Sequence, residues 1–110
     1  TYLELEEITP EFMDELSFLQ PFGQENPEPI FATRNARFRQ HPKVFKEAHF
    51  RFSLNDKNGR PLQGVAWNLA RRIPKLDTSV DIAYRLAWNS FGRQKALQLE
   101  LVDWKRSQLV

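Results

Sequence analysis

Few residues in this sequence are able to do catalytic chemistry, and they are spread along the chain. Its only imidazoles are His41 and His49, and the lack of Cys excludes thiol catalysis and a thiolate zinc site. A two-metal phosphodiester hydrolase needs several carboxylates and imidazoles that converge on metals about 3.5–4 Å apart. Two histidines in basic stretches do not meet that need, and His49 is predicted to lie on the surface rather than to bind a metal.

Other nucleophiles and acid–base pairs also lack a chemical context. The adjacent acids Glu6 and Glu7, like Asp14 and Glu15, lie in a uniformly acidic segment without a partner base, which a solvated face explains. The serines have no nucleophile-elbow sequence around them, and the four glycines form no phosphate-binding loop. We therefore predict that this chain is not an enzyme by itself and contains no cofactor.

Charge is distributed unevenly along the chain. Residues 1–33 contain eight acidic residues and no Lys or Arg, whereas residues 34–110 contain all 16 Lys and Arg and six acidic residues. A basic domain attracts polyanions such as nucleic acids. The alternative is that the basic part neutralises an acidic neighbour in a larger protein.

The acidic part is predicted to hold one helix and a stiff connector. Thr9 is a suitable N-cap, Pro10 fits the first helical position, and apolar residues then recur at helical spacing until Pro21. Residues 21–29 contain three prolines, which disfavour both a helix and the interior of a sheet.

After residue 29 the apolar pattern changes to the two-residue period of β-strands. Strands are predicted over residues 30–39, 49–55, 61–67, 80–89 and 96–104, with a short helix over residues 68–73 that Pro74 ends. In the clearest strand Phe50, Phe52 and Leu54 alternate with polar residues.

This order predicts a mainly β fold: a five-stranded oligonucleotide-binding (OB) barrel with a short helix between the third and fourth strands. Other small barrels and open sheets share the strand count. Residues 1–29 are expected to be the end of a preceding domain with its helix and linker, and residues 30–110 the OB domain.

Several segments resemble the C-terminal OB domain of RecJ-type single-strand-specific exonucleases, members of the DHH/DHHA1 superfamily. The longest is Leu-Gln-Pro-Phe-Gly-Gln-Glu-Asn-Pro-Glu-Pro-Ile-Phe at residues 19–31, which is similar to the joint before that barrel. At Trp67, where the family often has Phe, the sequence departs from the pattern. The likeness continues through residues 49–54, 64–67, 80–86 and 97–103 and so extends over nearly the whole chain.

The resemblance implies a fragment of a larger DNA repair and recombination enzyme. In that family an Asp-His-His motif and further carboxylates and histidines bind two divalent metals, Mg or Mn, in upstream domains, and this chain lacks the motif. The implied role is to hold single-stranded DNA and guide it to the catalytic domains of a parent 5′–3′ exonuclease.

Barrels of this kind bind nucleic acid on strands two and three and on the loops between strands one and two and strands four and five. Both predicted loops, residues 40–48 and 90–95, pair cations with an aromatic residue, which suits phosphates and stacked bases. The predicted nucleic-acid-binding residues are Arg37, Arg39, Lys43, Phe45, Lys46, Arg51, Arg85, Phe91, Arg93 and Lys95. Phe45 and Phe91 either stack on bases or plug the barrel ends. Arg71, Arg72 and Lys75 are left unassigned, since they would contact DNA or the acidic segment equally well.

In a second hypothesis, the same basic face binds protein instead of nucleic acid. It would close the parent enzyme into a ring or receive the acidic tail of a single-strand-binding protein. No apolar run approaches the roughly 20 residues of a membrane helix, and no signal peptide is apparent, so no membrane partner is expected. The lack of Cys suits a reducing compartment, and the cytoplasm is the expected location.

Overall fold

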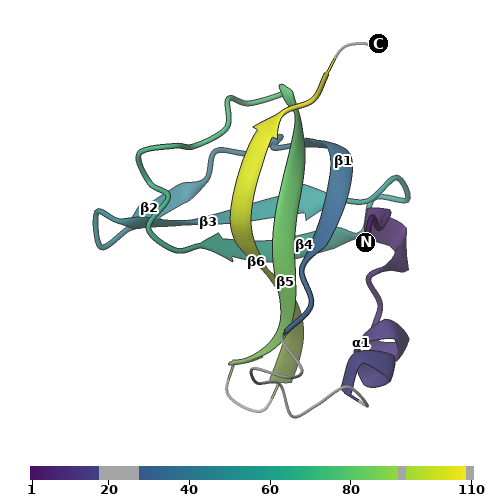
Figure 1. The fold of residues 1–110 in the computed structure, drawn as a ribbon. Coiled ribbons are helices and arrows are strands. Elements are labelled where there is room, and N and C mark those ends of the chain that lie inside the picture. The colour runs from purple at the N-terminus through teal and green to yellow at the C-terminus, as the bar shows by residue number, and fades with distance from the viewer. Residues whose placement is uncertain (18–27, 92–93, 109–110) are drawn as a thin grey trace.

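The computed structural model describes residues 1–17, 28–91 and 94–108, with the backbone alone at residues 90, 91 and 94. It contains one short α-helix followed by a mainly β region (Figure 1). The elements are the 3-10 helix η1 (Leu5–Glu7), α1 (Pro10–Ser17), β1 (Phe31–Arg37), β2 (Lys43–Phe45), β3 (His49–Asn55), β4 (Pro61–Ala66), β5 (Ser79–Phe91) and β6 (Gln94–Arg106).

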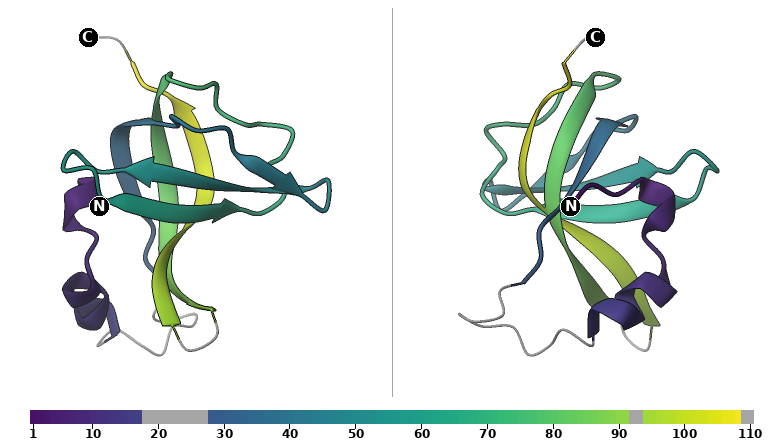
Figure 2. Two further views of the ribbon diagram at one scale, coloured as in Figure 1. Left: turned by 180° about the vertical axis from the view of Figure 1, so that it is seen from behind. Right: turned by 45° about the vertical axis from the view of Figure 1, so that its right-hand side comes forward.

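The six strands form one sheet in the order β1-β5-β6-β4-β3-β2. Neighbours are antiparallel except β4 and β6, which pair in parallel. The edge strands β1 and β2 are consecutive in the chain and are joined only by residues 38–42, so the sheet must curl to bring its edges near each other (Figure 2). No ladder of the described residues joins these two edges, and the sheet is therefore open.

The predicted mainly β fold is confirmed, and the sheet is consistent with an OB-like fold, but the strand count was wrong. The additional strand is β2, which lies inside the predicted loop of residues 40–48 and pairs with β3. Residues 46–48 connect the two strands, and Lys46 and Glu47 have positive φ angles of 51° and 57°, as in type I′ turns. Sequence pattern missed this hairpin because neither residue is a usual choice at positive φ.

The predicted helix over residues 68–73 is also wrong, and the only α-helix of the described residues is α1, before the sheet. Asn68 has a φ of 61°, which turns the chain away from a right-handed helix at the first predicted position. Its N–H donates to Nδ1 of His49 at 2.8 Å. A segment this short gains too few helical hydrogen bonds to offset the cost of nucleation.

Helix α1 begins where it was predicted to begin. Oγ1 of Thr9 accepts the N–H of Phe12 at 3.1 Å, and Pro10 is the first helical residue. The predicted continuation toward Leu19 and Pro21 lies outside the described residues. Among the described residues, no helix is long and apolar enough to cross a membrane.

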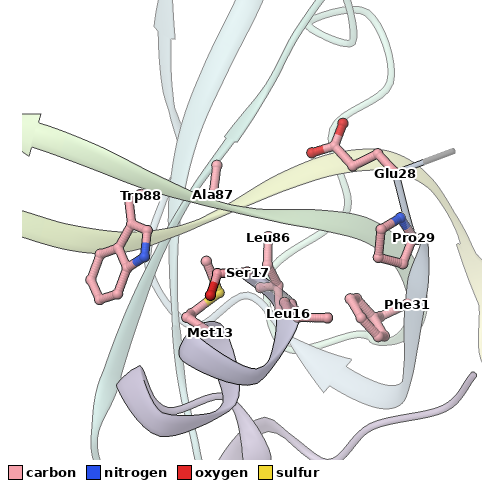
Figure 3. A pocket seen from close by; sticks show the side chains of 9 residues that line it. All are labelled: Met13, Leu16, Ser17, Glu28, Pro29, Phe31, Leu86, Ala87 and Trp88. Carbon is pink, nitrogen blue, oxygen red and sulfur yellow. The ribbon is translucent and has the colours of Figure 1, made fainter. Parts of the chain in front are cut away.

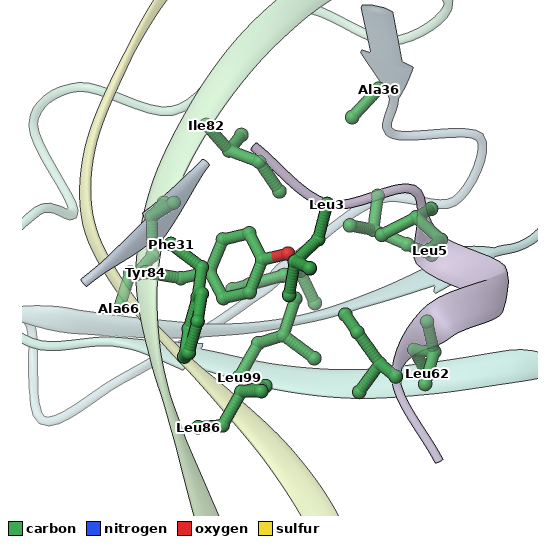
Figure 4. Close-up of a cluster of buried hydrophobic side chains, with 14 of the residues drawn as sticks. Leu3, Leu5, Phe31, Ala36, Leu62, Ala66, Ile82, Tyr84, Leu86 and Leu99 are labelled. Atoms are coloured by element: carbon green, nitrogen blue, oxygen red, sulfur yellow. The ribbon is translucent and has the colours of Figure 1, made fainter. Parts of the chain in front are cut away.

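The core lies inside the curled sheet and is lined mainly by strand residues at two-residue spacing (Figure 4). Phe50, Phe52 and Leu54 of β3 are buried, as their alternation predicted. The first 29 residues, here called the leader, also contribute to this core through Leu3, Leu5, Ile8 and Met13. The predicted domain boundary near residue 29 stays a prediction, and the described part of the leader packs as one body with the sheet.

A buried hydrogen-bonded chain ties the leader to the sheet. The Tyr84 hydroxyl lies 2.7 Å from Oγ1 of Thr33, which donates to the carbonyl oxygen of Leu3 at 2.9 Å. Since the Thr33 proton goes to Leu3, the Tyr84 hydroxyl is the donor to Thr33. Tyr84 is fully buried, and burial of its phenol raises its pKa to about 12.

The first prediction concerns this tyrosine at alkaline pH. An unfolded tyrosine ionises near pH 10, while the pKa of folded Tyr84 is about 12. Burial of the neutral phenol therefore favours the folded state below pH 10, and this contribution, about 2–3 kcal/mol, is lost as the pH rises through 12. Urea titrations between pH 10 and 12 should show that the free energy of unfolding of Tyr84→Phe falls less with rising pH than that of the unaltered chain. Tyr2→Phe, at a position 62% exposed, is the control and should show the same fall as the unaltered chain. Equal alkaline losses in both variants would contradict the assignment.

Candidate nucleic-acid interface

The outer face of the sheet is set by the inward side chains of β3. Because Phe50 and Phe52 point into the core, Arg51 between them points outward and is exposed. The pairing registers continue this position across five strands as a row, here called the charged row: Lys43, Arg51, Val65, Glu100 and Arg85. The next row on the same face is uncharged and is here called the amide row: Ser53, Gln63, Gln98 and Ala87.

A groove of about 610 Å³ lies over these two rows. It extends from the β2–β3 hairpin, across β4, to the β5–β6 hairpin. Its walls contain three aromatic side chains, three amides and one residue of each charge. These are Phe45, Trp67, Trp88, Gln63, Asn89, Gln98, Arg51 and Glu100.

Three rings and a guanidinium meet at the hairpin end of the groove. The Trp67 ring lies edge-on to Phe45 at 5.9 Å and to His49 at 5.0 Å between centroids. The Arg51 guanidinium lies over the Phe45 ring at 4.9 Å. Trp67 is 51% exposed, so part of its ring is open to a ligand while its neighbours hold its orientation.

His49 helps to position this cluster. Its Nδ1 accepts the N–H of Asn68 at 2.8 Å, which requires an unprotonated Nδ1 and places the ring proton on Nε2. The ring is half-buried against Phe45 and Trp67. No group of three or more His, Asp or Glu in the described ranges is arranged to hold a metal ion.

Several predicted binding residues gather around the same hairpin. Lys43 and Lys46 are exposed, Arg51 is exposed beside them, and Phe45 is half-buried with its ring in the groove wall. Phe45 therefore packs on the outer face of the sheet. This position does not match the second of its two predicted roles, which was to plug an end of the barrel.

The remaining predicted residues lie elsewhere or only partly within the described chain. Arg85 is in the charged row, and its Nε lies 3.7 Å from Oε2 of Glu28 in the leader. Lys95 is exposed at the start of β6. Arg93 lies outside the described residues, and so does the side chain of Phe91.

Arg37 and Arg39 do not line the groove. They line a second hollow of about 590 Å³, together with Glu4 and Glu6 of the leader, and the Arg37 guanidinium donates to the carbonyl oxygen of Asp77. The predicted cations are thus divided between two surfaces. A third hollow of about 360 Å³, between α1 and β5, is lined mainly by apolar residues, and no Lys or Arg of the described chain lines it (Figure 3).

The acidic leader contacts cations other than those at the groove's hairpin end. Oε1 of Glu6 accepts the N–H of Lys57 at 3.0 Å, and this hydrogen bond lowers the pKa of the Glu6 carboxyl. The Arg60 guanidinium donates to the carbonyl oxygen of Leu5 at 3.0 Å. Within the described ranges, no carboxylate forms an ion pair with Lys43, Lys46 or Arg51.

The cations left unassigned by the sequence have different positions. Arg72 donates to Oδ1 of Asp103 at 2.6 Å and stacks on the Trp104 ring at 4.5 Å, so it holds the segment before β5 against β6. The hydrogen bond from Arg72 lowers the pKa of Asp103. Arg71 and Lys75 are exposed.

Pattern analysis did not identify Trp67, Gln63 and Gln98 as groove residues. Trp67 was recognised only as a departure from a family pattern, and the two glutamines are ordinary outward positions of their strands. They line one groove because β4 and β6, far apart in the chain, pair in parallel. Only the pairing register carries that information.

Comparison with solved structures identifies the fold. Two crystal structures of RecJ from Thermus thermophilus, in complex with Mn²⁺ and with Mg²⁺, are both 24% identical to the chain, with TM-scores of 0.67 and 0.68. The matches cover 92% and 91% of this chain but only 14% and 15% of those proteins. An asparaginyl-tRNA synthetase from Entamoeba histolytica matches more weakly, with a TM-score of 0.52 and 15% identity over 70% of this chain and 20% of that one.

Sequence comparison points the same way. No curated protein sequence matches the chain. The family model of the RecJ OB domain, however, matches residues 1–103, which include the leader, the charged row and the amide row. The chain therefore belongs to the RecJ OB domain family.

Proposed function

We propose that this chain binds single-stranded DNA in the groove and acts as the OB module of a RecJ-type 5′–3′ exonuclease in the cytoplasm. Its role would be to keep the strand directed toward a catalytic core that lies outside these 110 residues. Divalent metal chemistry, with Mg or Mn, would belong to that core.

The observation that carries the proposal is the contact between Arg51, Phe45 and Trp67 at the hairpin end of the groove. A cation there attracts a phosphate, and the half-exposed Trp67 ring offers a face on which any base can stack. Lys43 and Lys46 add positive charge at the same end. Duplex DNA buries its base faces within its own stack, so an exposed ring favours an unpaired strand.

The second hypothesis, that an acidic protein segment binds in the same groove, can be tested by titrating the chain with an oligonucleotide and with an acidic peptide. A labelled oligonucleotide of about 12 nucleotides fits the usual range for one OB fold. An acidic peptide that binds more tightly than this oligonucleotide would favour protein interaction over DNA binding.

The second prediction is that Trp67→Ala weakens oligonucleotide binding about 5- to 160-fold, since stacking of one base on an aromatic ring contributes about 1–3 kcal/mol. Fluorescence anisotropy at fixed salt would measure the change. Trp104→Phe is a suitable control because Trp104 packs against Arg72 away from the groove. Unchanged affinity of the Trp67 variant would contradict the assigned stacking role.

The third prediction concerns the dependence of binding on salt. If Arg51 neutralises one phosphate, Arg51→Ala should make the log–log salt slope about 0.7 less negative, as expected for a single strand. Lys57→Ala removes the same charge at an exposed turn whose contact with Glu6 uses the backbone, and it should leave the slope unchanged. Binding that does not respond to salt in the unaltered chain would refute the proposed function.

A further inference from the structure

We infer that Gln63 and Gln98 form a subsite that hydrogen-bonds the edge of an unpaired nucleobase. The inference rests on the proposed binding of single strands. Beyond that function, it specifies that the floor of the groove contacts the base of the nucleotide.

The two amides are neighbours across the parallel pair of β4 and β6. Adjacent strands are about 4.8 Å apart, so side chains at paired positions on one face can reach the same ligand group. Both point outward because the residues that alternate with them, Gly64 and Leu99, are buried on the core side. Both also line the groove.

The amide groups are available to a ligand. An amide side chain presents one acceptor oxygen and one nitrogen with two donor hydrogens. Toward the residues that the structure describes, neither Gln63 nor Gln98 uses its side chain in a hydrogen bond. Gln98 is half-buried in the wall of the groove, so its amide group stays close to a ligand bound there.

Charge at the floor favours a base over a phosphate. A phosphate presents only acceptors and negative charge, and Glu100 lies in the adjoining row of the same groove. Its carboxylate would repel a phosphate placed on the floor, while Arg51, Lys43 and Lys46 attract phosphates toward the hairpin end. A base edge is neutral and offers both donors and acceptors, which matches the amide row.

Aromatic rings at the two ends of the groove are suited to hold such a base in place. Gln63, in β4, precedes Trp67 by four residues, which spans about 13 Å of extended chain, and Trp88 lies toward the β5–β6 hairpin. Stacked bases are about 3.4 Å apart, so a few bases fit between Trp67 and the amide row. Because an amide can turn to match any donor–acceptor pair, the subsite would contact bases without selecting among the four.

The test compares two oligonucleotides of about 12 nucleotides, one intact and one with abasic residues at its central positions. The double variant Gln63→Leu/Gln98→Leu should bind the intact strand about tenfold more weakly than the unaltered chain, from the loss of two hydrogen bonds. On the abasic strand the two proteins should bind within about twofold of each other, because no base edge is there to be contacted. Gln40→Leu, an exposed amide that does not line the groove, is the matched control and should change neither affinity.

The single variant Gln63→Leu, at an exposed position, should lose about threefold in affinity for the intact strand alone. It keeps the test decisive if the double variant unfolds. An equal loss on both strands would show that the amides act on the backbone or the fold, and no loss on either would show that they do not bind the ligand. Both results overturn the inference and leave the proposed function intact. Failure of the unaltered chain to bind the intact strand would overturn both.

Discussion

The packing of Phe52 against Gly64 determines which side chains face the groove. A Cβ at position 64 would stand 2.1 Å from Cζ of Phe52, so only glycine lets this ring lie flat against β4. The ring also stacks on Phe38 at 4.9 Å. Once Phe52 points inward, the two-residue period of β3 places Arg51 and Ser53 on the outer face, and the pairing with β4 places Val65 and Gln63 beside them. A shift of one residue in this register would move the charged row into the core.

The contacts of the leader with basic residues fall away from the hairpin end of the groove. The buried chain from Tyr84 through Thr33 to Leu3 fixes the leader beside β1, on the core's opposite flank from the β2–β3 hairpin. Glu6 accepts the backbone N–H of Lys57, Glu28 pairs with Arg85, and the carbonyl oxygen of Leu5 accepts from Arg60. All three contacts lie outside the hairpin end of the groove. The charge asymmetry along the chain therefore does not cancel at the place where a strand is proposed to bind.

The sequence was most informative where a single face is buried. The alternation in residues 49–55 predicted a strand with one buried face, and the cap at Thr9 predicted the start of α1. It failed at Lys46, Glu47 and Asn68, where non-glycine residues adopt positive φ angles. Such turns depend on the tertiary contacts that hold them, such as the hydrogen bond between Asn68 and His49. The groove itself could not be predicted, because Gln63 and Gln98 become neighbours through a parallel pairing between distant strands.

The central claim is that nucleic acid occupies the groove over the charged and amide rows. The most direct measurement is the change in backbone amide NMR shifts of the chain on addition of a single-stranded oligonucleotide. The largest changes should fall on residues around Arg51, Gly64, Trp67 and Gln98. Changes concentrated at Arg37, Asn55 and Lys57, which line the second hollow, would contradict the account.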